Sequence, residues 1–115
     1  MSAEAAALAN RLRELTVQFA AEVPQAVSEL LDLVAQAARS DGAPRRERLV
    51  QIELLAHRLN GRAAMYEWSR LSRRAAAVEA AAAAMLAGKG SWNARLPALC
   101  EALTRAIPTR TGSPV

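Results

Sequence analysis

Aromatic residues, histidine and cysteine are scarce in this chain of 115 residues, which contains four aromatics, one histidine and one cysteine. A β-sandwich or barrel of this length needs many more aromatic and β-branched side chains, so the scarcity argues against both folds. The five glycines form no Gly-rich phosphate-binding loop, which argues against a Rossmann or P-loop enzyme. Alanine, with 28 residues, and leucine dominate instead, and both are strong helix formers. We therefore expect a single all-α domain that spans residues 1–115.

The single cysteine, Cys100, excludes a disulfide within the chain and a zinc site built from several cysteines. No apolar run reaches the roughly 18 residues that a membrane span needs, and the alanine-rich stretch 75–87 is interrupted by Glu79. The first ten residues carry Glu4 and lack the basic segment of a signal peptide. These features predict a cytoplasmic protein that does not bind a membrane.

Basic residues outnumber acidic ones by 15 to 11, which gives a formal net charge of +4, and 14 of the 15 are arginine. The guanidinium group matches carboxylate and phosphate, so the excess fits an acidic or phosphorylated partner. A GC-rich bacterial genome produces the same bias. The arginines are spread over several predicted helices between glutamates, and no helix-turn-helix pattern stands out, so we do not expect binding to nucleic acid.

Apolar residues recur at three- and four-residue spacing along five segments, which predicts five helices. The first carries Leu8, Leu12, Leu15 and Phe19 on one side and ends at Pro24, where a joint or kink is expected. The other predicted helices cover residues 24–38, about 46–66, from 68 or 69 to 87, and about 96–107.

Short breaks separate the predicted helices. Residues 40–44 form the clearest loop, Pro97 fits the first turn of the last helix, and residues 92–95 are expected to form a separate turn. Because short connections force neighbouring helices to alternate in direction, we expect an antiparallel up-and-down four-helix bundle with a short additional N-terminal helix. Its core is expected at about residues 8–107, with a frayed tail at 108–115.

His57 is the only candidate for chemistry that the residues themselves offer. Glu53 lies one helical turn before it, but no set of Cys, Asp or Glu residues around it supplies three or four metal ligands, so no metal site is expected. On a helical wheel the apolar face of this helix centres near Ile52, Leu59 and Ala63, and His57 lies roughly 140° away. The imidazole is therefore predicted to face solvent.

Gly61 follows His57 by one turn, at a position where glycine costs about 0.5 to 1 kcal/mol relative to alanine. Its missing side chain would let a large partner approach the imidazole. Val50, Leu54 and Ala64 place apolar residues on the same side, where the core does not need them. Exposed apolar residues bordered by charge indicate a protein-docking surface.

Two sequence stretches carry a resemblance to a known family. Residues 56–64, AHRLNGRAA, are followed by LSRRAAAVE at residues 71–79. They resemble the histidine-containing phosphotransfer (HPt) domains of bacterial multistep phosphorelays, whose patterns are Ala-His-x-Leu-Lys-Gly-x-Ala and Leu-x-x-x-Ala-x-x-Leu-Glu. Residues 19–24 and the leucine-rich stretch after them also resemble the family, and the similarity covers about residues 8–107. The chain departs from the pattern at Asn60, where the family usually has lysine, and at Glu67, near a position often held by glycine.

The resemblance implies a phosphoprotein of two-component signal transduction that acts as a phosphoryl carrier rather than as a self-sufficient catalyst. His57 would accept a phosphoryl group from the aspartyl phosphate of one receiver domain and pass it to another. Asn60 and Gly61 would lie beside the phosphoryl group. The partner-docking residues would be Val50, Glu53, Leu54, Arg58 and Ala64.

The expected partners are receiver domains of response regulators and of hybrid histidine kinases, with the chain acting as a monomer. No cofactor is expected on this chain, and Mg²⁺ is expected on the partner receiver domain. A second hypothesis is an HPt-like module that binds a receiver or a kinase without relaying a phosphoryl group.

Overall fold

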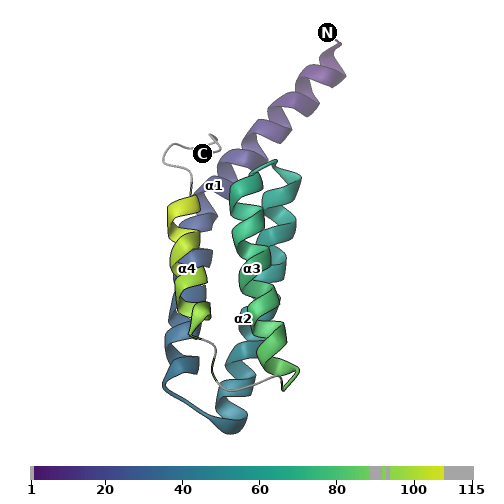
Figure 1. Ribbon diagram of the computed structural model, residues 1–115. Helices are drawn as coiled ribbons and strands as arrows, with labels where there is room; N and C mark the ends of the chain where they lie inside the picture. The colour runs from purple at the N-terminus through teal and green to yellow at the C-terminus, as the bar shows by residue number, and fades with distance from the viewer. Residues whose placement is uncertain (1, 89–91, 93, 108–115) are drawn as a thin grey trace.

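The computed structural model of the chain describes residues 2–88, 92 and 94–107. The described residues form four α-helices and no strand (Figure 1). The helices are α1 (Ala3–Ala38), α2 (Gly42–Met65), α3 (Ser69–Leu86) and α4 (Arg95–Ala106). The all-α class is therefore confirmed. The predicted tail, residues 108–115, and part of the predicted turn at residues 92–95 lie outside the described residues.

No helix in the described part of the chain combines the length and the apolar character that a bilayer crossing requires.

The first helix continues through Pro24, so the joint between two helices expected there is wrong and a separate short N-terminal helix is not formed. Phe19, Val23 and Val27 are buried on both sides of Pro24, while Pro24 itself is exposed. Proline inside a helix costs about 3 kcal/mol, whereas each large apolar side chain contributes about 1.5 to 3 kcal/mol when it is buried. The uninterrupted apolar seam therefore outweighs the local cost of the proline.

The connection between α1 and α2 is shorter than the loop predicted at residues 40–44, because α2 already begins at Gly42. Pro44 consequently lies in the first turn of α2, where its missing N–H removes no helical hydrogen bond. Arg45 ties the two helices together by donating from Nε to the carbonyl oxygen of Ala37 over 2.9 Å. Pro97 lies in the first turn of α4, as predicted.

The four helices pack in a ring in which α1 contacts α2 and α4, and α3 contacts the same two helices. Figure 1 shows α2 and α3 side by side, and they form the most extensive helix pair. Among the residues that the structure describes, no polar or charged side chain is fully buried. Several core positions on α2 and α3 are alanines that are completely buried, and small side chains allow helix axes to approach closely. These alanines are Ala56, Ala63, Ala75 and Ala82.

Three of the four aromatic residues meet at one end of the bundle. The ring of Phe19 on α1 lies 5.0 Å from that of Tyr66 and 4.9 Å from that of Trp68. Arg62 of α2 covers Phe19, with its guanidinium carbon 4.7 Å from the ring centre, and donates to Glu22 over 2.5 Å. This cluster fixes the end of α2 against α1.

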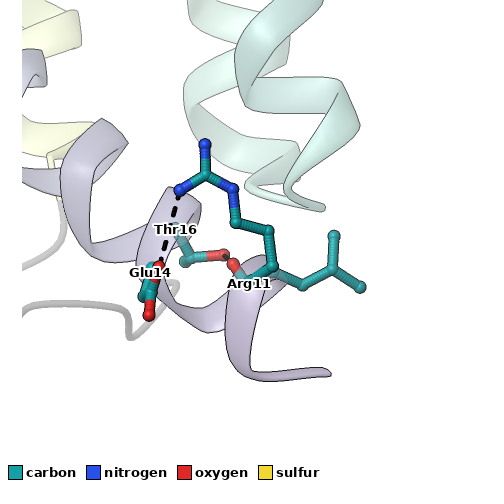
Figure 2. Close-up of polar contacts among 4 residues, drawn as sticks. Arg11, Glu14 and Thr16 are labelled. Atoms are coloured by element: carbon teal, nitrogen blue, oxygen red, sulfur yellow. Dashed lines mark hydrogen bonds and ion pairs between the residues drawn. The ribbon is translucent and has the colours of Figure 1, made fainter. Parts of the chain in front are cut away.

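The first turns of α1 project beyond the ends of α2 and α3 (Figure 1). The projecting part is held by local interactions, which Figure 2 shows: Arg11 pairs with Glu14, and the hydroxyl of Thr16 donates to the carbonyl oxygen of Leu12. Leu8 and Leu12, which the sequence pattern placed on the core side of the first helix, remain exposed. The described core therefore begins at Phe19 rather than near residue 8.

The turn from α2 to α3 depends on a left-handed residue that is not glycine. Glu67 has φ +62°. Its N–H donates to the carbonyl oxygen of Ala64, and the N–H of Trp68 donates to the carbonyl oxygen of Ala63. These two bonds form a Schellman motif, in which glycine normally occupies the position of Glu67. Trp68 completes the motif with a buried side chain. Glu67 therefore carries backbone strain at the bend where the sequence departs from the HPt pattern.

Replacing Glu67 with glycine is expected to raise the free energy of unfolding. The left-handed conformation costs a residue with a Cβ about 1 to 2 kcal/mol, and the greater freedom of glycine in the unfolded chain offsets part of the gain. The net stabilisation should be about 0.5 to 1 kcal/mol, measured by urea unfolding. Glu47→Gly is the matched control, because this exposed glutamate lies in the regular part of α2 and its loss should destabilise by about 1 kcal/mol. A loss of stability in both variants would contradict strain at Glu67.

Candidate functional site

His57 lies on α2 beside α3 and is exposed, as the helical wheel predicted, with 69% of its side chain accessible. Its Nδ1 atom is 2.9 Å from Oε2 of Glu79 on α3. Glu79 is more deeply placed, with 27% of its side chain accessible. The ring is therefore attached to the neighbouring helix through one nitrogen while the rest of it faces solvent.

The contact with Glu79 determines which ring nitrogen is free to react. An ionised carboxylate only accepts hydrogen bonds, so Nδ1 carries a proton and donates a hydrogen bond to Glu79. The lone pair of the neutral imidazole is then on Nε2. Within the described part of the chain, Nε2 makes no hydrogen bond. The arrangement presents an oriented, solvent-accessible nitrogen nucleophile.

Asn60, one turn after His57, makes a second link between the same two helices. Its Oδ1 accepts a hydrogen bond from the hydroxyl of Ser72 on α3 over 2.5 Å. Both residues are half-buried. Because residues three apart are neighbours on a helix, His57 and Asn60 lie on the same side of α2, at its boundary with α3.

Gly61 is exposed, and a Cβ added to it would meet no atom of the described residues within 4 Å. Its φ also lies outside the left-handed region that favours glycine. Neither packing within the chain nor backbone conformation therefore requires glycine at this position. The open space next to His57 is available to a molecule outside the chain.

The predicted docking residues all lie on α2. Val50 and Leu54 are large apolar side chains with 50% and 48% of their surface accessible, and Ala64 is exposed. Glu53 is half-buried and, in the described structure, does not pair with His57; Glu79 does. These residues supply an apolar and partly acidic surface on the helix that carries the imidazole.

The arginines of α2 do not supply a cation to His57. Arg62 is directed towards α1, where it pairs with Glu22. Arg58 is exposed and precedes Arg62 by four residues, so it shares that face of α2 rather than the one beside α3. Asn60, three residues after His57, is a neutral polar residue of α2 that contacts α3 beside the histidine.

Other chemistry finds little support in the described residues. No three His, Cys, Asp or Glu side chains within residues 2–88, 92 and 94–107 are grouped so that they could hold a metal ion. Cys100 is completely buried, and burial raises the pKa of its thiol to about 12. Because the thiolate is the reactive form, Cys100 cannot act as a nucleophile in the folded chain near neutral pH.

Sequence reasoning did not assign a role to Glu79 or Ser72. Both belong to the stretch 71–79 that resembles the HPt pattern, and they are seven residues apart, which places them on one side of α3. The seven-residue spacing was the sequence signal that Ser72 and Glu79 could act together at one site. Its meaning depends on the register of α3 against α2, because only the register brings Glu79 to His57 and Ser72 to Asn60.

Substituting Glu79 with alanine is expected to change the tautomer of His57 while leaving the fold intact. Without the acceptor on α3, the proton of the neutral ring should shift from Nδ1 towards Nε2, which ¹⁵N chemical shifts of the imidazole measure directly. His57 is largely exposed and Glu79 is partly exposed, so stability should fall by no more than about 1 kcal/mol. Glu53→Ala is the control and should leave the tautomer unchanged. An identical nitrogen spectrum in wild type and Glu79→Ala would contradict the assignment.

No family model, curated protein or solved structure matches this chain. Its function is therefore inferred from the site itself: an exposed imidazole whose Nδ1 is held by Glu79, a neighbouring amide held by Ser72, and an open glycine position on a partly apolar helix face.

Proposed function

We propose that this chain is a phosphorelay shuttle of the HPt type, in which Nε2 of His57 carries the phosphoryl group. The observation that carries the proposal is the hydrogen bond from Nδ1 to Glu79, which leaves Nε2 as the exposed nucleophile. The helices would alternate in direction as an antiparallel up-and-down bundle. The three-residue connections after α1 and after α2 support this topology, because they leave no length for a return along the bundle.

Transfer to the chain would form one bond and break one bond. The Nε2 lone pair attacks the phosphorus of a receiver aspartyl phosphate, the N–P bond forms, and the P–O bond to the aspartate breaks and releases its carboxylate. Passing the group on reverses these changes on a second receiver: its aspartate attacks the phosphorus and Nε2 recovers its lone pair. Nδ1 retains its proton throughout, and the carboxylate of Glu79 stabilises the positive charge that phosphorylation places on the ring.

The chain's own contribution would be orientation and access. Its exposed nitrogen is held in one direction by α3, which reduces the entropy lost in reaching the in-line geometry. Stabilisation of charge on the transferred group would come from Mg²⁺ and a lysine on the receiver, since the α2 arginines are directed elsewhere. The protein would thus be a carrier rather than a complete catalyst.

The partner would be a receiver domain of a response regulator or of a hybrid histidine kinase, met by the chain as a cytoplasmic monomer. Val50 and Leu54 support this docking mode, because they expose apolar surface on the face near His57. Gly61 would let the receiver's active-site loops approach the ring.

A second candidate is a module that binds a receiver or a kinase without relaying. Asn60 favours it, because a neutral amide stands where the HPt pattern has a lysine next to the phosphorylation site. The loss of that cation weakens electrostatic attraction for a phosphoryl group more than attraction for a protein surface.

Phosphorylation of His57 separates the two candidates. Wild type and His57→Gln are incubated with phosphoramidate, a small phosphodonor, and separately with phosphorylated receiver domains from the same organism. The relay predicts acid-labile, base-stable phosphate on the wild type and at least a hundredfold less on His57→Gln, roughly the effect of removing an essential nucleophile. Equal labelling of the two proteins would exclude His57 as the acceptor. Receiver binding without label on the wild type would establish the non-relaying module.

Enlarging Gly61 is expected to block the partner without damaging the nucleophile. Gly61→Leu should retain the helical circular dichroism, because the added side chain enters open space, but it should slow transfer from a receiver by about tenfold or more through steric clash. Its labelling by phosphoramidate should stay near that of wild type. Gly61→Ala should be about 1 kcal/mol more stable than wild type and transfer faster than Gly61→Leu. If Gly61→Leu slowed phosphorylation by the receiver and by phosphoramidate by the same factor, the result would argue against a role of Gly61 in giving the receiver access to His57.

A further inference from the structure

The amide of Asn60 can help or hinder a phosphoryl group according to which of its ends faces His57. The oxygen end repels an anion, whereas the nitrogen end offers two N–H donors. A lysine needs no such control, because every hydrogen on its ammonium group is a donor. A chain that carries asparagine here therefore gains from a device that fixes the amide's orientation.

The structure contains such a contact. Ser72 donates its hydroxyl hydrogen to Oδ1 of Asn60 over 2.5 Å, which engages the oxygen end of the amide with α3. Within the described part of the chain, Nδ2 makes no hydrogen bond, and Asn60 is only half-buried. The two N–H donors therefore remain available on the side of the amide away from Ser72, one helical turn from the ring of His57.

Both contacts of the site come from the same face of α3. Glu79 and Ser72 are seven residues apart, about two helical turns, and each holds one residue of α2. The buried alanines of α2 and α3 allow the two helices to pack closely, and each of the two contacts limits the freedom of one α2 side chain.

We propose that Ser72 is a positioning residue for phosphoryl transfer: by binding Oδ1 of Asn60 it turns the amide N–H donors towards a phosphoryl group on Nε2 of His57. The inference rests on the proposed relay function. During attack by Nε2, negative charge gathers on the non-bridging oxygens of the phosphoryl group, and the oriented amide donates to them. A neutral donor pair thereby takes the place of the cation in the HPt pattern.

A double-mutant cycle between Ser72 and Asn60 tests the proposal. The rate of His57 phosphorylation by phosphoramidate is measured by ³¹P NMR for wild type, Ser72→Ala, Asn60→Ala and the double variant. Ser72→Ala should slow phosphorylation roughly threefold to tenfold, as expected for the loss of one orienting hydrogen bond, and should have no further effect when Asn60 is already alanine. Ser72→Thr retains the hydroxyl and should restore the wild-type rate.

Two further measurements separate positioning from a general structural effect. Ser28→Ala replaces an exposed serine within α1 and should leave the rate unchanged. Urea unfolding and the ¹⁵N shifts of His57 should be nearly the same in wild type and Ser72→Ala, since alanine favours the helix and Glu79 is untouched.

The outcomes distinguish this inference from the proposed function. Absence of phosphate from wild-type His57 would overturn the relay and the role of Ser72 together. A wild type that is phosphorylated at the same rate as Ser72→Ala would overturn the positioning role alone. Slowing by Ser72→Ala that is equally large in the Asn60→Ala background would also overturn it, because the effect would then not pass through Asn60.

Discussion

Close packing of α2 on α3 is the constraint on which the candidate site depends. Fully buried alanines occupy core positions on both helices, at Ala56, Ala63, Ala75 and Ala82. Side chains of this size allow helix axes to lie close together, so polar side chains at the edge of the contact can reach across it. Glu79 reaches His57 and Ser72 reaches Asn60 in this way. The abundance of alanine in the chain is thus connected directly to the geometry of its only histidine.

The bend between α2 and α3 maintains the register of these contacts. A Schellman motif ends α2, buried Trp68 closes it, and Phe19 packs on both Tyr66 and Trp68. The left-handed conformation of Glu67 persists because the free energy gained by packing the aromatic rings exceeds the free-energy cost of one strained residue. The bend therefore sets the register of α2 against α3 at one end of the pair. Because both helices rise by the same length per residue, this register also determines which residues lie opposite each other at His57.

Sequence periodicity predicted much of the core, with Leu8 and Leu12 as exceptions, but not which residues meet across helices. The face that centres on Ile52, Leu59 and Ala63 is buried, and the solvent-facing position of His57 followed from the same wheel. The expected end of the first helix at Pro24 was wrong because a local rule for proline competes with burial on both sides of it, and burial prevails. The partner of His57 could not be predicted, since a wheel gives the face of one helix and contains nothing about its alignment with the next. Glu53 was the nearer glutamate in sequence, yet Glu79 holds the ring.

The positions of the α2 arginines show why this helix brings no positive charge to the candidate site. Arg62 is the basic residue one turn after Arg58 on α2, and it is engaged with Glu22 and the face of Phe19, where it secures α1. The residue that follows His57 by three positions on the α3 side is the neutral Asn60. A phosphoryl group on Nε2 would therefore receive no cation from α2, and the exposed apolar side chains of Val50 and Leu54 would contribute to docking. A carrier organised in this way stabilises the transferred group fully only while a partner is bound, which favours passing the group on over retaining it.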